Sequence, residues 1–231
     1  MNKKNLLRQI FCLRKKIIFF YEERKRIEKL KYFEKIQVSD GFRFIAGIDE
    51  AGRGALAGPV VAAAVIIKDI DTFFLAYLKD SKRLTKEKRE LLFNIIKRNC
   101  YDFGIGIVSP EIIDRINIAQ ASFLAMKRAI KNLKQYPDCP DFILVDAFKI
   151  PFIKIPQNNL VKGEDKSVSI AAASIIAKVC RDQIMYRNHE KYPFYQFNRN
   201  VGYGTKYHLI SIKKHGICPL HRKTFKGVFG Y

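Results

Sequence analysis

Two aspartates that end short apolar runs are the first candidates for chemistry in this 231-residue sequence. Asp49 follows the run Ile45–Ile48, and Asp146 follows the run Phe142–Val145. A carboxylate at the end of a buried strand costs free energy unless another group compensates its charge. Either acid alone could simply cap a turn. Together, in a very basic chain, they favour a shared cation, and oxygen ligands suit Mg²⁺ or Mn²⁺ better than Zn²⁺.

Further acids precede a long helical pattern near residue 166. Glu164 and Asp165 could bind a metal, or could stabilise the helix N-terminus by a few tenths of a kcal/mol. Asp182 lies about 17 residues beyond Asp165, which is roughly 25 Å along a helix that rises ~1.5 Å per residue. Two catalytic ions lie only about 4 Å apart. We therefore expect Asp182 to be structural, paired with Arg181 or Lys178.

A glycine-rich segment, Gly52-Arg53-Gly54, follows the adjacent acids Asp49 and Glu50. It matches neither the P-loop pattern nor the dinucleotide-binding pattern G-x-G-x-x-G. Glycine lets the backbone approach a ligand closely, and Arg53 offers a charged fork for phosphate. A tight hairpin turn is the alternative, because such a turn also needs glycine.

The charge of the chain indicates an anionic partner. Lys and Arg total 43 against 22 Asp and Glu, which gives a net charge of +21. Nucleic acid is the commonest polyanion that such an excess attracts, and an anionic membrane surface is the alternative. No apolar stretch is long enough to span a bilayer, and no signal-peptide cleavage site follows the basic N-terminus. The five scattered cysteines form no disulfide framework, so we expect a cytoplasmic protein with no membrane partner.

Residues 1–42 differ from the rest of the chain. Apolar residues recur there at helical spacing between twelve Lys or Arg and five Asp or Glu. The pattern predicts one or two basic amphipathic helices that end near Asp40, as an extension of a main domain over residues 43–231. Three roles stay open for this extension: a cap packed on the main domain, an accessory nucleic-acid arm, or a membrane-surface helix.

The main domain alternates between strand-like and helical patterns, which predicts an α/β fold with a mixed sheet covered by helices. A basic segment with nine Lys or Arg and one acid follows Tyr186. The predicted strands lie at 42–48, 59–67, 103–108, 142–145 and 152–155, and the predicted helices at 85–97, 117–133 and 166–188.

Five sequence blocks resemble, in order, those of bacterial type II ribonuclease H (ribonuclease HII). They are GIDEAGRGALAGPVVAAAVI, DSKRLTKEKRE, ILVDA, KGEDKSVSIAAASIIAKVCRD and GYGTKYHLISIKKHGICPLHRKTF. The blocks extend from about Ile45 to Phe225, and the first and last are highly specific. The resemblance implies a ribonuclease H-like fold, with a mixed central sheet flanked by helices and a helical C-terminal segment.

The resemblance also implies a metal site. Asp49, Glu50 and Asp146 match the first three acidic ligands of the family, which hold two Mn²⁺ or Mg²⁺ ions during catalysis. The fourth ligand is usually the Asp of K-G-D, and here Glu164 stands at that position. Asp165 could replace it only if the local register slips by one residue. Ala147 stands where the family usually has Gly, and this departure removes no chemical group.

Substrate contacts follow from the same resemblance. The Gly52–Gly54 segment matches the backbone that contacts the 2′-hydroxyl next to an RNA–DNA junction, and Tyr203 matches a tyrosine that packs on the neighbouring deoxyribose. The 2′-hydroxyl is the group that distinguishes RNA from DNA at a given nucleotide. Lys82 and Lys206 are candidate phosphate contacts, with simple surface solvation as the alternative.

The activity that the resemblance implies is hydrolytic. A monomeric endonuclease would cut the RNA strand of RNA–DNA hybrids, and would cut 5′ of single ribonucleotides embedded in duplex DNA. The products would carry 5′-phosphate and 3′-hydroxyl ends, and the activity would serve removal of misincorporated ribonucleotides and of primers. Two alternatives remain: a ribonuclease H that prefers long hybrids, and a non-catalytic protein that binds hybrids.

Overall fold

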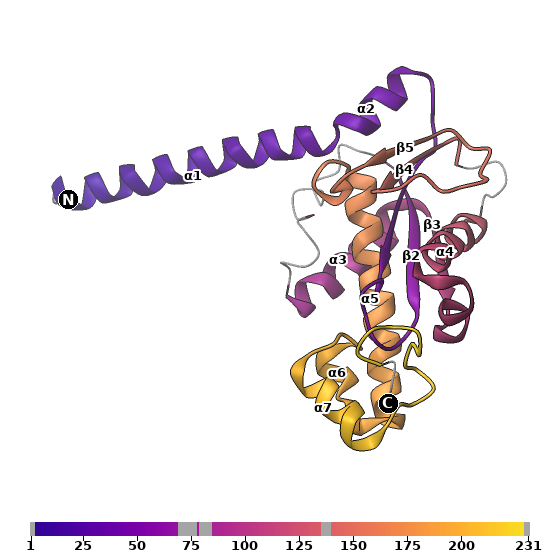
Figure 1. The fold of residues 1–231 in the computed structure, drawn as a ribbon. Coiled ribbons are helices and arrows are strands. Elements are labelled where there is room, and N and C mark those ends of the chain that lie inside the picture. Colours follow the sequence, from indigo (N-terminus) through magenta and orange to yellow (C-terminus); the bar gives the residue numbers. More distant parts are fainter. Residues whose placement is uncertain (1–2, 69–77, 79–84, 135–139, 229–231) are drawn as a thin grey trace.

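A five-stranded mixed sheet forms the centre of the protein (Figure 1). The computed structural model describes residues 3–68, 78, 85–134 and 140–228. The order of strands is β3-β2-β1-β4-β5; β1 pairs antiparallel with β2 and parallel with β4. The strands are β1 Ile45–Ala51, β2 Val60–Ile67, β3 Cys100–Val108, β4 Phe142–Asp146 and β5 Gln157–Leu160.

Helices cover both faces of this sheet, as the sequence pattern predicts. Figure 1 shows α4 on one side of the strands and α5 on the other, with α3 beside α5. The helices are α1 Lys3–Leu30, α2 Tyr32–Ser39, α3 Lys86–Asn99, α4 Pro110–Lys131, α5 Val168–Lys191, α6 Phe197–Asn200 and α7 Lys206–His215. Short 3₁₀ helices lie at η2 Gly163–Asp165 and η3 Pro193–Tyr195.

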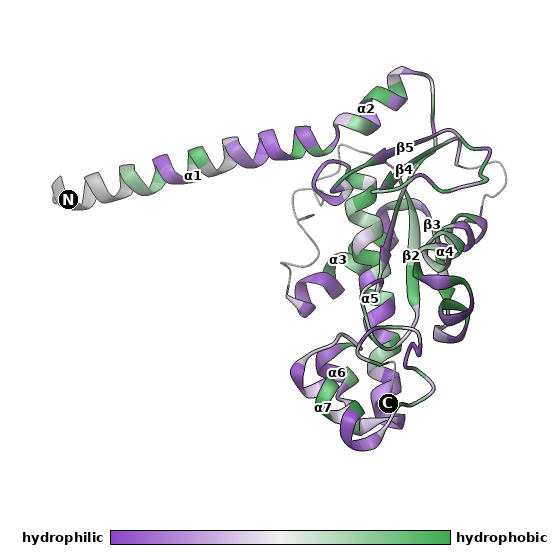
Figure 2. Cartoon of the chain, viewed as in Figure 1, coloured by the Kyte–Doolittle hydropathy of each residue, from purple (hydrophilic) through white to green (hydrophobic). Residues whose placement is uncertain are grey.

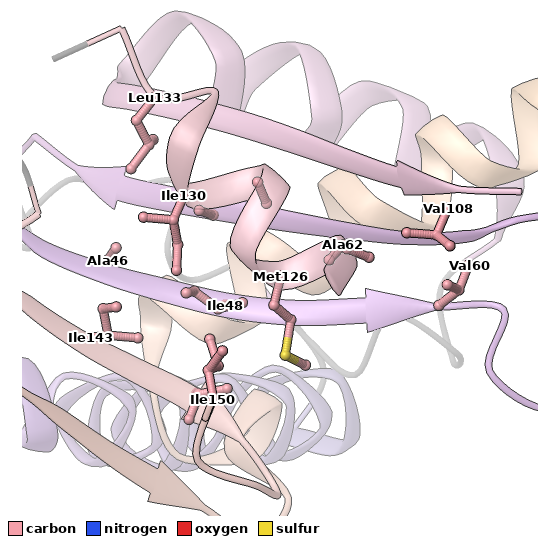
Figure 3. Packing of buried hydrophobic residues seen from close by; sticks show 14 of the residues in the cluster. Ala46, Ile48, Val60, Ala62, Val108, Met126, Ile130, Leu133, Ile143 and Ile150 are labelled. Atoms are coloured by element: carbon pink, nitrogen blue, oxygen red, sulfur yellow. The ribbon is translucent and has the colours of Figure 1, made fainter. Parts of the chain in front are cut away.

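Successive side chains of β1 and β2 point to opposite faces of the sheet, and each face is covered by its own apolar layer. Ile48 and Met126 belong to the layer between the sheet and α4, which Figure 3 shows from close by. Val65 and Ala172 belong to the layer under α5 and α3. Helix α5 approaches β1 so closely that a Cβ on Gly47 would lie 2.0 Å from the backbone carbon of Ser169. A glycine is therefore required at position 47.

Two predicted elements were wrong in position. The predicted strand at 152–155 is a loop, because Phe152 has a φ of 57° and is 98% exposed. The fifth strand is instead Gln157–Leu160, whose polar side chains give no strand pattern; the amide of Gln157 bonds both backbone groups of Ile150 at 2.8 Å. It is an edge strand, so its pairing with β4 does not need an apolar face.

Helix α4 begins at Pro110 rather than at Asn117. Ser109 caps its N-terminus by accepting a hydrogen bond from the backbone of Ile112. Asn117 then interrupts the helix with a φ of 65°, and its side-chain oxygen accepts bonds from the backbone nitrogens of Ala119 and Gln120. The predicted start at Asn117 is thus the start of the second part of a kinked helix.

The N-terminal residues form two helices, as predicted. Figure 1 shows α1 projecting away from the sheet, whereas α2 lies against it, and Figure 2 shows polar and apolar residues mixed along α1. Glu34 on α2 is 2% exposed and accepts hydrogen bonds from Ser167 and Ser169 at the start of α5. Burial raises the pKa of Glu34, and these hydrogen bonds oppose that rise. Among the described residues, no helix is long and apolar enough to cross a membrane.

Candidate active site

Asp49 lies near the end of β1 with its side chain on the α5 face of the sheet. It is 7% exposed, and the backbone nitrogen of Glu50 donates a hydrogen bond to its Oδ1 at 2.7 Å. The pKa of Asp49 is raised well above its usual value by burial first, and then by the charges of Glu50, Asp146 and Glu164; a hydrogen bond from Ser174 opposes the rise. Four carboxylates are therefore close enough to repel one another.

Glu50 follows Asp49 in β1 and turns toward the glycine-rich loop. Its carboxylate lies 3.5 Å from the guanidinium of Arg53. Burial raises the pKa of Glu50, the charge of Arg53 lowers it, and the charge of Asp146 raises it. Glu50 thus connects the acidic cluster to the Gly52–Gly54 segment.

Asp146 ends β4, the parallel neighbour of β1. Ile48 pairs with Val145, so the residues that follow them, Asp49 and Asp146, lie side by side at the same end of the sheet. The backbone nitrogen of Gly163 donates to Asp146 Oδ1 at 2.7 Å, and a Cβ on Gly163 would lie 3.2 Å from that oxygen. The predicted convergence of two strand-end aspartates is the geometry observed.

Glu164 and Asp165 differ in where their side chains lie. Glu164 is partly buried, and its Oε2 accepts a hydrogen bond from Ser174 at 3.1 Å. Asp165 is exposed. The charge of Glu164 contributes to the raised pKa of Asp49. The register expected from K-G-D therefore brings Glu164, and not its neighbour, to the acidic cluster.

Ser174 on α5 was missed by sequence reasoning. Its hydroxyl donates to Glu164 and also lies close enough to Asp49 to lower the pKa of that carboxyl, so it contacts acids from two elements. The sequence contains only a weak indication of this role, namely a single hydroxyl residue in an alanine-rich stretch of a buried helix. Only the contact of α5 with β1 shows which acids that hydroxyl faces.

Three of the four acids, Asp49, Glu50 and Asp146, line a cleft of about 600 Å³. The cations Arg53, Arg89 and Lys178 line the same cleft. The lining residues are Asp49, Glu50, Ala51, Gly52, Arg53, Gly54, Arg89, Asp146, Ser174, Lys178 and Tyr203. The carboxylates could bind metal cations, and the lysine and arginine side chains could bind the phosphates of a substrate.

Lys178 and Arg89 are cleft residues that the sequence did not reveal. Asp182, which is 5% exposed, accepts a hydrogen bond from Lys178 at 2.8 Å and lies 3.9 Å from Arg89. Asp182 is thus paired with Lys178, one of the two partners expected from the sequence. The four-residue spacing of Lys178 and Asp182 could have suggested their pairing, but Arg89 joins them only through the packing of α3 on α5.

The acidic cluster fits a pair of hard divalent cations by its chemistry. Its donors are all carboxylate oxygens, which suit Mg²⁺ and Mn²⁺. Crowding and burial raise the pKa values of Asp49 and Glu50, and a divalent cation would compensate that charge. Among the described residues, however, no three His, Cys, Asp or Glu side chains already surround one point as metal ligands.

The remaining residues expected to touch substrate lie in different places. Tyr203 lines the cleft, and its ring centre lies 5.6 Å from Lys178 Nζ. Gly52 has a φ of 90°, which favours glycine, and Gly54 has open space around it. Lys206 is exposed in the first turn of α7 and does not line the cleft. Lys82 lies outside the described residues.

Comparison with known proteins agrees with the fold and the sequence blocks. The family model for ribonuclease HII matches residues 46–228. A ribonuclease HII from Clostridioides difficile is 51% identical over 213 residues, which cover 92% of this chain and 82% of the relative. A second, from Caldanaerobacter subterraneus, is 52% identical over 204 residues, which cover 88% of this chain and 82% of the relative.

Solved structures give the same result. The ribonuclease H2 of Pyrococcus horikoshii superposes with a TM-score of 0.68 at 27% identity, and the match covers 80% of this chain and 95% of that one. A ribonuclease HII of Archaeoglobus fulgidus, solved in a complex with PCNA, gives a TM-score of 0.64 at 28% identity, covering 80% and 96%. The chain therefore belongs to the ribonuclease HII family.

Proposed function

We propose that this ribonuclease H cuts the RNA strand of RNA–DNA hybrids and also cuts 5′ of single ribonucleotides embedded in duplex DNA. The supporting observation is that one cleft is lined by Asp49, Glu50 and Asp146 of the acidic cluster, by the Gly52–Gly54 segment and by Tyr203. The proposed centre for phosphodiester hydrolysis thus lies next to the surface that would distinguish ribose from deoxyribose. The products carry 5′-phosphate and 3′-hydroxyl ends.

The hydrolytic part of the site consists of Asp49, Glu50, Asp146 and Glu164, which would hold two Mn²⁺ or Mg²⁺ ions. Such ions supply an activated water and compensate charge on the leaving 3′-oxygen. Ser174 holds Glu164 against the cluster through its hydroxyl. The nitrogen of Gly163 holds Asp146 in the same way. These two hydrogen bonds orient the carboxylates before substrate binds.

The recognition part of the site consists of a backbone segment and a ring. The Gly52–Gly54 segment has little side-chain bulk except at Arg53, so a sugar can approach its peptide groups closely. Tyr203 is 36% exposed beside it and presents a flat apolar face. A ring packed on a deoxyribose leaves no room for an added hydroxyl. The pair therefore selects a ribonucleotide that is followed by a deoxyribonucleotide.

Binding to the nucleic-acid backbone comes from the cations of the cleft and from the overall charge of +21. Lys178 and Arg89 are held in place by Asp182 on the cleft wall, which positions them for phosphates. Such contacts fix the register of the duplex without reading its sequence, and salt weakens them steeply. The substrate is thus recognised by its backbone and sugars rather than by its bases.

This activity serves removal of misincorporated ribonucleotides and of primers, by a monomer that acts in the cytoplasm. Residues 1–42 form an extension to the catalytic domain at 43–231. Glu34 attaches this extension to α5. The projecting α1 is basic, and we assign it to accessory contact with nucleic acid.

The test compares three duplexes of the same sequence: one with a single ribonucleotide, one uniform RNA–DNA hybrid, and one of DNA alone. With Mn²⁺ or Mg²⁺, we expect cutting of the first two, with the first cut 5′ of its ribonucleotide. Cutting of the uniform hybrid alone would favour a ribonuclease H that needs long hybrids. Binding without cutting would favour a non-catalytic protein. Asp49→Asn is the matched control, which should bind the duplex and leave it intact.

A further inference from the structure

Two guanidinium groups lie fully buried behind the Gly52–Gly54 segment. The side chains of Arg181 on α5 and Arg222 in the C-terminal segment are each 0% exposed. Within the described part of the chain, neither forms an ion pair with a carboxylate. A buried charge is costly unless hydrogen bonds compensate it. The hydrogen-bond partners of these two arginines therefore indicate which part of the structure the arginines stabilise.

Arg222 donates three hydrogen bonds, and all of them go to backbone carbonyls of the loop between β1 and β2. Its Nη2 bonds Gly52 at 2.7 Å, its Nη1 bonds Arg53 at 3.0 Å, and its Nε bonds Gly58 at 3.0 Å. One planar group thus fixes both ends of the loop. Two of the three carbonyls belong to the segment proposed to recognise the ribose.

These hydrogen bonds determine which way the neighbouring N–H groups point. In a trans peptide, the carbonyl and the following N–H point in opposite directions. Because the carbonyls of Gly52 and Arg53 point inward to Arg222, the N–H groups of Arg53 and Gly54 point away from it, toward the cleft that these residues line. Within the described residues, neither N–H donates to a protein acceptor. Two oriented donors thus face the site.

Arg181 supports the same loop from the side of α5. Its Nε donates to Pro59 and its Nη2 to Ala57, each at 3.0 Å. It packs so tightly under Gly52 that a Cβ there would lie 1.9 Å from Nε. Its guanidinium carbon also lies 5.3 Å from the ring centre of Tyr203. Arg181 therefore contacts both the loop and the tyrosine of the proposed recognition surface.

The backbone of the C-terminal segment completes this assembly. The carbonyl of Gly202, next to Tyr203, accepts hydrogen bonds from the nitrogens of Leu56 and Ala57 at 2.8 and 3.2 Å. The nitrogen of Arg222 donates to the carbonyl of Leu56 at 2.9 Å. The loop and Tyr203 are thus held as one unit, with the two arginines at its centre.

We propose that Arg222 and Arg181 are positioning residues for ribose recognition. They hold the peptide planes of the Gly52–Gly54 segment so that the N–H groups of Arg53 and Gly54 meet the 2′-hydroxyl. The inference rests on the function proposed above for that segment. A lysine keeps the charge but lacks the rigid planar fork, so it cannot fix the directions of the three carbonyls that Arg222 holds together. The fork of Arg222 is the decisive feature.

The test uses Arg222→Lys and Arg181→Lys in the full chain, with Arg199→Lys as the matched control on an exposed arginine of the same C-terminal segment. Steady-state kinetics are measured with Mg²⁺ on the single-ribonucleotide duplex and on the uniform hybrid. We expect Arg222→Lys to lower kcat on the first substrate about tenfold or more, as when an oriented donor is lost from a reacting site. KM should change little, and junction preference should fall. Arg181→Lys should show a smaller loss in the same direction.

The outcomes separate this inference from the proposed function. If the wild-type protein cuts the uniform hybrid but not the single ribonucleotide, the proposed function fails and the inference with it. If the wild type cuts at the junction and both lysine variants, melting within a few degrees of it, keep its kcat and junction preference, the inference alone fails. A parallel loss on both substrates with unchanged preference would show a general structural role, and would also overturn it.

Discussion

The hydroxyl of Ser174 donates a hydrogen bond to Glu164 across 3.1 Å, and this contact joins the 3₁₀ turn η2 to helix α5. The same hydroxyl also lies close enough to Asp49 on the central strand to lower the pKa of that carboxyl. One small side chain thus holds together acids that are more than a hundred residues apart in the sequence. The contact also gives Glu164 a place in the site that its exposed neighbour Asp165 lacks.

Glu164→Gln should therefore be far more damaging than Asp165→Asn. We expect the first change to lower kcat roughly 100-fold, the order found when one charged group is removed from a reacting centre. Asp165→Asn should change kcat by no more than about threefold, as for most surface substitutions. Single-turnover cleavage of a hybrid measures both. The reverse order would assign the fourth acidic position to Asp165.

Lys178→Gln should weaken duplex binding equally for all sequences. The amide can still donate to Asp182, so the variant removes the charge without leaving that buried carboxylate unpaired. We expect the slope of log Kd against log salt concentration to fall by about one, the value for one lost phosphate contact. Titration of a fluorescent duplex at several salt concentrations measures it. The matched control is Lys97→Gln, on an exposed lysine of α3. An equal effect of the control would show that only net charge matters.

The acidic part of the site could be predicted because strand ends are visible in the sequence. Asp49 and Asp146 each follow an apolar run, and parallel strands bring such ends together. The helix after residue 166 and the helical N-terminus were predicted by the same periodicity. Strand β5 could not be predicted, because Gln157 and its polar neighbours pair through the backbone alone.

The cations of the cleft, and the residues that hold the site in place, could not be predicted for a different reason. Arg89, Lys178 and Ser174 are ordinary helix residues in the sequence, and only the packing of α3 and α5 aims them at the cleft. In the sequence, Arg181 looks like one more cation of a helix and Arg222 like one more cation of the basic C-terminal segment. Their burial depends on a loop that is distant in sequence and offers five carbonyls.

Ala147→Gly should stabilise the protein. Ala147 has a φ of 60°, a left-handed conformation that costs a residue with a Cβ about 1–2 kcal/mol. Glycine avoids that cost but loses more entropy on folding, so we expect the free energy of unfolding to rise by about 0.5–1 kcal/mol. Urea denaturation measures it. Ala173→Gly, a buried position inside α5, is the opposite control and should destabilise the fold by about 1 kcal/mol or more. A destabilising Ala147→Gly would contradict the conformation of this turn.

Acid should destabilise the protein through the buried contact of His208 with His221, whose Nε2 atoms lie 3.1 Å apart. His208 Nδ1 faces the carbonyl of Tyr203 and the nitrogen of Cys218 donates to His221 Nδ1, an arrangement that two neutral rings satisfy. Burial and then the charge of His208 lower the pKa of His221 from 6.5 to about 4. The unfolded chain therefore binds more protons between these values, and stability should fall as pH drops from 6.5 to 4, by up to about 3 kcal/mol. The midpoint of urea unfolding, measured at several pH values across that range, tests this. The control is His221→Gln, whose stability should depend less on pH. If the stability of the wild type depended on pH no more steeply than that of the variant, a neutral histidine pair would be contradicted.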